Sequence, residues 1–76
     1  MTARVTEKLA NGELRVTVSG EFGFETAREL LFVCRARWQA GAKSIVVDMS
    51  GVIGLSSCGV GTLVLISELA NEAARI

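Results

Sequence analysis

Apolar and polar residues alternate in the first third of the chain, and this pattern predicts a β-hairpin. From Leu14 to Val18 every second residue is apolar, so one face of this strand should lie in the core and the other in water. A second apolar segment, Val5 to Leu9, precedes it across Asn11-Gly12, a dipeptide that favours a tight hairpin turn. We expect Gly20 to end the second strand.

The next segment has helical spacing. Its apolar residues should face the sheet: Ala27, Leu30, Leu31, Cys34 and Trp38. Thr26 followed by Glu29 is a capping-box pattern, and Gly41 is a candidate left-handed cap at the other end.

A short apolar run then predicts a strand from Ser44 to Met49. Its β-branched residues, Ile45, Val46 and Val47, suit a strand buried on both faces of a parallel sheet. We expect Asp48 and Ser50 to end this strand, and Gly51 and Gly54 to loosen the connection that follows. The strand-helix-strand order from Leu14 to Met49 implies a right-handed crossover and parallel strands.

A second helix is predicted from about Ser57 to Ala74. Its apolar positions form more than one stripe: Val60, Leu63, Val64, Leu65, Ile66, Leu69 and Ala70. A helix that is apolar around most of its circumference is either deeply buried or a contact surface for another protein.

The start of this helix carries hydroxyl, thiol and backbone N–H groups at the positive end of the helix dipole. Such a place can hold or receive a phosphate. The alternative is that Ser56 or Ser57 merely caps the helix and that the glycines let the loop pack.

Composition limits the classes of function. A chain of 76 residues makes a single domain, 1–76, and its eight basic residues balance its eight acidic ones, which argues against binding of nucleic acid or anionic membranes. Cys34 and Cys58 lie in different predicted helices, and with no histidine they argue against a zinc site and for reduced thiols in the cytoplasm. The longest apolar run, Val60 to Ile66, is too short for direct membrane insertion.

Catalysis has the least support. Without histidine, and with Asp48 as the only aspartate, the chain cannot assemble a Ser-His-Asp or Cys-His arrangement, and its glycines do not form a phosphate-binding loop. We therefore expect a non-enzyme without a cofactor, in which Asp48 is a strand-end residue bonded to nearby backbone N–H groups.

The residues from Asp48 to Gly61 resemble the signature of the STAS domains of bacterial anti-sigma factor antagonists. The family pattern reads aspartate, apolar, serine, glycine, valine, then apolar, aspartate, serine, serine, glycine, leucine, glycine, and it fits Asp48 to Val52 and Leu55 to Gly61 without a gap. Gly20, Glu21 and Thr26 resemble the family more weakly. The resemblance implies an α/β fold, with a mixed β-sheet covered by helices in the order β-β-α-β-α.

Two positions depart from the pattern. The second serine of the family's aspartate-serine-serine triplet is the phosphate acceptor, and here that position is Cys58, while Ser56 stands at the aspartate position. Ser57 and Ser56 remain candidate acceptors. The simplest interpretation is a module that has lost the conventional phosphorylation switch and stays competent to bind.

The resemblance implies a protein interaction module that regulates transcription by binding an anti-sigma factor, often a serine kinase. The expected contact surface is the start of the second helix and the neighbouring start of the first helix: Gly54, Leu55, Ser56, Ser57, Cys58, Gly59, Gly61, Phe24 and Thr26. One alternative is a peripheral STAS subunit of a membrane transport ATPase of the lipid-trafficking type. Another is a thiol-based sensor, because a thiol at a helix N-terminus reacts faster, unless Cys58 is simply a small buried residue.

The family's domain continues with another strand and further helices, which we expect this chain to lack. The unpaired edge of the Ser44 to Met49 strand would then favour association. We expect a homodimer or higher oligomer that buries this edge together with Leu65 and Ile66.

Overall fold

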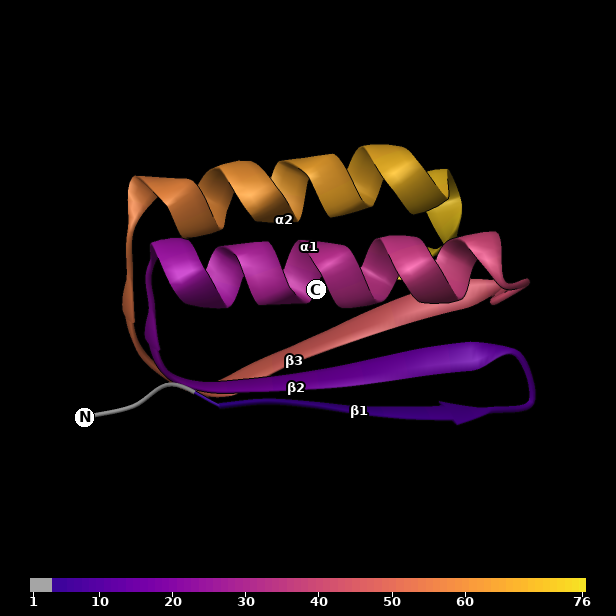
Figure 1. Cartoon of the computed structure of the whole chain (residues 1–76), viewed down its shortest axis with the longest axis horizontal. Coiled ribbons are helices and arrows are strands. Elements are labelled where there is room, and N and C mark those ends of the chain that lie inside the picture. Colours follow the sequence, from indigo (N-terminus) through magenta and orange to yellow (C-terminus); the bar gives the residue numbers. More distant parts are fainter. Residues whose placement is uncertain (1–3) are drawn as a thin grey trace.

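The computed structural model describes residues 4–76, and only the backbone of Glu72. These residues form a sheet that two helices cover on one face (Figure 1). The elements in chain order are β1 (Arg4–Ala10), β2 (Glu13–Phe22), α1 (Phe24–Gln39), β3 (Ser44–Leu55), α2 (Ser57–Ala70), the 3-10 turn η1 (Asn71–Ala73) and β4 (Ala74–Arg75). The sheet order is β1-β2-β3-β4, in which β1 is antiparallel to β2 and the other pairs are parallel. The predicted fold class and its β-β-α-β-α order are confirmed.

The hairpin forms as predicted, but its second strand is longer. Asn11 and Gly12 take φ values of 55° and 81°, which are typical of a type I′ turn, and Ala10 pairs with Glu13 across it. Gly20 does not end β2: it takes a φ of 84° inside the strand, and pairing continues to Phe22.

The expectation that Asp48 and Ser50 end the third strand is wrong, because β3 runs on to Leu55. It keeps pairing with β2, with Ser19 opposite Gly51 and Phe22 opposite Leu55, through two register shifts. A Cβ at Gly51 would lie 3.0 Å from that of Ser19. This glycine therefore permits the close approach of two strands rather than a loop.

The expectation of no further strand also needs correction. The second helix ends at Ala70 instead of about Ala74, because Asn71 takes a φ of 53° and turns the chain back toward the sheet. β4 then pairs with Ile45 and Val46, so this part of the β3 edge is not free. Asparagine tolerates positive φ better than most residues, so Asn71 is the feature of the sequence that indicates this turn.

The first helix begins without the predicted capping box. Gly23 is the N-cap, so no side chain caps the helix start. The Thr26 hydroxyl instead donates to the carbonyl oxygen of Glu21 at 3.3 Å. The C-terminal prediction is confirmed, since Gly41 has a φ of 111°. The N–H groups of Gly41 and Ala42 donate to Trp38 and Arg37, as in a Schellman motif.

The core lies between the helices and one face of the sheet. Its fully buried large side chains are Phe22, Leu14, Leu30, Ile45, Ile66, Val16, Val18, Val47 and Cys34. Val46 is only half-buried, contrary to the expectation of burial on both faces, because both helices cover the same face. Ile66 is 0% exposed within one chain, so it cannot be the interface residue that we expected. No helix in residues 4–76 is long and apolar enough to cross a membrane.

Candidate functional site

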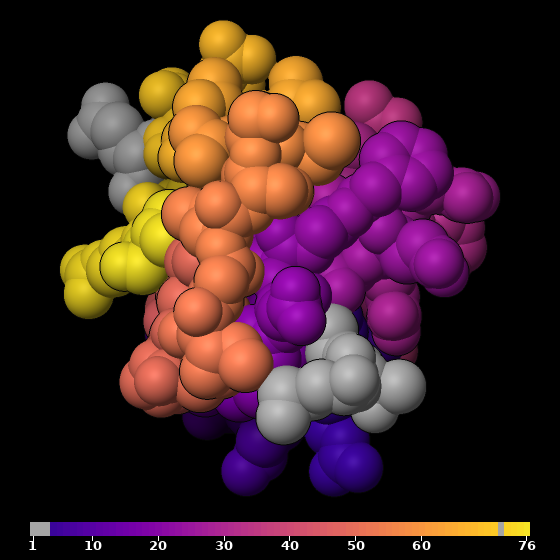
Figure 2. Space-filling model, turned by 90° about the vertical axis from the view of Figure 1, so that its left-hand side faces the viewer, coloured from indigo at the N-terminus to yellow at the C-terminus, as the bar shows by residue number. Residues whose placement is uncertain are grey.

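The starts of both helices meet at one end of the molecule. β2 and β3 are parallel, so the connections that leave their carboxyl ends lie at the same edge of the sheet. Figure 2 views this end and shows the start of α2 (orange) beside the start of α1 (purple). The backbone N–H of Ser56 donates to the carbonyl oxygen of Phe22 at 3.1 Å, which joins the two connections directly.

Ser56 is the N-cap of α2, so the capping alternative is correct for this residue. Its hydroxyl accepts from the backbone N–H of Gly59 at 3.3 Å and donates to the carbonyl oxygen of Phe22 at 3.0 Å. Both hydrogen bonds fix the hydroxyl in place, although the residue itself is exposed.

Ser57 and Cys58 are the first two residues of α2, and both are exposed. Their backbone N–H groups have no acceptor within the helix, and the first turn carries no acidic residue. The positive end of the helix dipole is therefore uncompensated here, beside one free hydroxyl and one thiol. The alternative that Cys58 is a small buried residue is wrong.

Two of the predicted contact residues are buried and support the surface from below. A Cβ at Gly59 would lie 2.6 Å from Leu55 Cδ1 and 2.7 Å from Phe22 Cδ1, so only glycine fits without movement. Thr26 is 7% exposed and its hydroxyl is bonded to Glu21. Neither residue is placed to contact a partner.

The other predicted residues, apart from Ser57, line two hollows at this end. Gly54 and Leu55 line one of about 260 Å³ with Ser56, between the starts of the two helices. A second, of about 300 Å³, is a mostly apolar groove between α1 and α2. Its lining residues are Phe24, Ala27, Arg28, Leu31, Cys58, Gly61, Thr62 and Leu65.

Arg28, Leu31 and Leu65 in this groove were not among the predicted contact residues. The Arg28 guanidinium carbon lies 5.9 Å from the centroid of the Phe24 ring, which is itself 62% exposed. The signal was available, because Phe24, Arg28 and Leu31 are spaced by four and three residues and so share one face of a helix.

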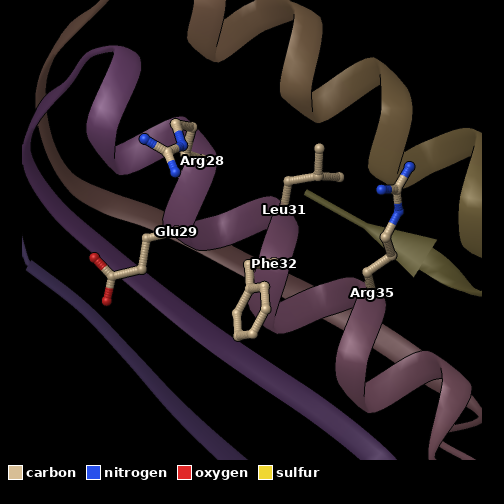
Figure 3. A pocket seen from close by; sticks show the side chains of 5 residues that line it. All are labelled: Arg28, Glu29, Leu31, Phe32 and Arg35. Carbon is tan, nitrogen blue, oxygen red and sulfur yellow. The ribbon is translucent and has the colours of Figure 1, made fainter.

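A larger hollow, of about 490 Å³, lies on the outward surface of α1 (Figure 3). All five of its lining residues come from this one helix: Arg28, Glu29, Leu31, Phe32 and Arg35. Their side chains point away from the helix in different directions instead of converging. This hollow is a surface depression, and we do not assign it a site.

Asp48 lies inside β3 and not at its end, but it does bond to a nearby backbone N–H as predicted. Its Oδ1 accepts from the backbone N–H of Ser50 at 2.9 Å and from the Ser50 hydroxyl at 2.8 Å. These two bonds lower the pKa of the Asp48 carboxyl. The residue shapes the strand locally and is not part of the candidate site.

Comparisons with known proteins agree with this geometry. The model of the STAS domain family matches residues 3–75. A crystal structure of an anti-sigma factor antagonist from Mycobacterium paratuberculosis has a TM-score of 0.80 at 26% identity, covering 97% of this chain and 63% of that one. No curated protein sequence matches this chain.

Two further solved structures show the same fold at lower identity. The anti-sigma factor antagonist SpoIIAA in its unphosphorylated form has a TM-score of 0.76 at 13% identity, covering 88% of this chain and 63% of that one. The STAS domain of an antisigma-factor antagonist from Rhodobacter sphaeroides has a TM-score of 0.68 at 18% identity, covering 96% and 80%. The chain thus spans just under two thirds of the first two structures. Its match to the family model over nearly its whole length shows that it belongs to the STAS domain family.

Proposed function

We propose that this chain is the partner-binding part of an anti-sigma factor antagonist. Its partner is an anti-sigma factor, of the kind that is also a serine kinase, and binding releases the sigma factor to act in transcription. Membership of the STAS family and the likeness to an anti-sigma factor antagonist at 26% identity support this role.

The exposed start of α2 carries the proposal. Ser56 is held by Phe22 and Gly59, so Ser57 and Cys58 stand at the surface with free N–H groups. Acidic groups of a partner are favoured at such a helix end. Phe24, which is exposed at the neighbouring start of α1, adds apolar contact area.

Cys58 makes binding independent of conventional phosphorylation, because a serine kinase does not phosphorylate a thiol in the usual way. In a member with serine at this position, a phosphate of about two negative charges would repel an acidic partner surface. Here the module stays in its binding state.

The test measures the affinity of the purified chain for the anti-sigma factors of its own genome by titration calorimetry. Cys58→Asp should weaken binding by about tenfold or more, because the new carboxylate repels the acidic groups that the helix end attracts. Phe32→Asp is the matched control, because Phe32 is exposed on the far face of α1 and should leave the affinity unchanged.

Cys58→Ser completes the experiment. If the partner is a kinase, this variant should accept phosphate from ATP and then lose affinity, while the unchanged chain should do neither. Unaltered binding by Cys58→Asp, or stable recovery with a membrane transport ATPase and with no anti-sigma factor, would contradict the proposal.

A further inference from the structure

The outward face of α2 carries an apolar stripe that the other described residues, 4–76, leave largely exposed. Val60, Val64 and Leu65 are 49%, 52% and 46% exposed, whereas Ile66 on the opposite face is fully buried. Gly61 lies among them, and a Cβ built there would meet nothing within 4 Å. The stripe therefore has a hollow at Gly61, and the side chains of Val64 and Leu65 project from the helix one turn further on.

We propose that two copies of this chain pair through α2, with their helices antiparallel about a two-fold axis level with Leu63. Gly61 and Leu65 lie equally far on either side of that level. An antiparallel arrangement consequently brings Val64 and Leu65 of each copy against Gly61 of the other. Because the axis lies near the middle of Ser57–Ala70, the two helices overlap along their whole length.

Charge complementarity favours the same arrangement. Glu68 follows Val64 by four residues and is exposed on this stripe. In the antiparallel pair it lies level with Cys58 of the other copy, at the α2 N-terminus, whose first turn has no acidic residue of its own. A carboxylate is stabilised at that end of a helix, and the two-fold axis makes the contact twice.

The apolar stripe is narrow, even with Phe24 on its rim. A stable interface usually buries about 800 Å² on each partner, so we expect a weak dimer that forms in the micromolar range or above. This pairing does not rest on the proposed function. It covers Cys58 and Gly61, however, so a second copy and an anti-sigma factor would compete for the same surface.

Sedimentation equilibrium over micromolar to millimolar concentrations tests the pairing. The unchanged chain should approach twice the mass of one chain as concentration rises. Gly61→Leu, which fills the hollow, and Leu65→Ala, which removes the side chain that enters it, should each raise the dissociation constant by about tenfold or more. Phe32→Ala removes an apolar side chain on α1 that is even more exposed, at 73%, and should change nothing. The mass of a single chain at every concentration, or an equal weakening of the dimer by Phe32→Ala, would overturn the proposal.

Two further variants test the orientation of the helices. Glu68→Lys should weaken the dimer more than Glu68→Gln, and the difference should shrink in high salt. In a Cys58→Ser background, Val64→Cys should form an intermolecular disulfide on mild oxidation, since position 64 lies close to the two-fold axis. Phe32→Cys in the same background should not. A dimer that is insensitive to Glu68→Lys, with no disulfide at position 64, would mean that the copies pair elsewhere.

Discussion

At the residue scale, three neighbouring small, exposed residues have two different roles. Ser56 caps α2 and is fixed by its bonds to Phe22 and Gly59, whereas Ser57 and Cys58 are the first residues of the helix itself. The sequence predicts a small, polar helix start, but it does not say which serine is the cap. That depends on where β3 ends, and the strand ends six residues later than its apolar run suggests, at Leu55 instead of Met49.

The two cysteines also differ, because Cys34 is fully buried in the core. Burial, helped by the negative charge of Glu7, raises the pKa of the Cys34 thiol from 9.0 to about 11. In the unfolded chain the thiol ionises at its ordinary pKa, so raising the pH above 9 favours the unfolded state.

We therefore predict that the free energy of unfolding falls between pH 9 and pH 11. The fall should reach about 2 to 3 kcal/mol, since each pKa unit corresponds to about 1.4 kcal/mol. Urea denaturation at a series of pH values, in a Cys58→Ser background that leaves Cys34 as the only thiol, measures it. Cys34→Ala in that background should remove this fall, and an identical fall in both proteins would refute the assignment.

At the element scale, simple patterns predicted the elements well and their ends poorly. The alternation from Leu14 to Val18, the Asn11-Gly12 turn and the Gly41 cap are local signals, and the structure follows each of them. The length of β3 is not a local property. It results from pairing with β2 through two register shifts, and no feature of β3 alone reveals these shifts.

The capping box at Thr26 failed for a related reason. The end of β2 brings the Glu21 carbonyl oxygen within reach of the Thr26 hydroxyl, which bonds there instead of capping α1. The burial of Gly59 likewise depends on Leu55 and Phe22, two residues from different strands. Such contacts exist only after the strands have paired, so spacing alone could not predict this part of the site.

The two glycines in the first turns of α2 should respond oppositely to alanine. Gly59→Ala places a methyl group against Leu55 and Phe22 and should destabilise the chain by about 1 to 3 kcal/mol. Gly61→Ala enters open space and should stabilise the helix by about 0.5 to 1 kcal/mol.

Thermal or urea unfolding at low protein concentration compares the two variants without a contribution from self-association. Circular dichroism of the folded state controls for loss of helix. If Gly59→Ala proved as stable as Gly61→Ala, this would contradict the inference that Gly59 packs tightly against Leu55 and Phe22.

At the scale of the whole molecule, the sheet has one covered face and one open face. Both helices pack on the side of Leu14, Val16 and Ile45, while Arg15 and Thr17 project from the other side of β2. The mixed sheet and its helices could be predicted from the sequence because the STAS signature and the strand-helix-strand order point to the same topology. The surface through which copies of the chain associate could not be predicted in the same way, since Ile66, one of the expected interface residues, lies in the core.

Stability should be unevenly distributed over this architecture. β2 is paired along both edges and buries four apolar side chains completely, whereas β1 is an edge strand with mostly exposed residues and β4 pairs through two residues. Native-state hydrogen exchange should therefore be slowest for amides near Val16 and Val47 and fastest in η1 and β4. Equal protection of β4 and β2 would contradict this ranking.

The bond between Ser56 and Phe22 has one more consequence. It ties two segments that are 34 residues apart in the chain, so the starts of α1 and α2 are held as a single rigid unit. A ligand that docks across both helix starts meets a pre-organised surface and spends little conformational entropy in ordering it. Loosening this one link should slow recognition and shorten the lifetime of any complex, even though neither Ser56 Oγ nor the Phe22 carbonyl oxygen needs to touch the ligand.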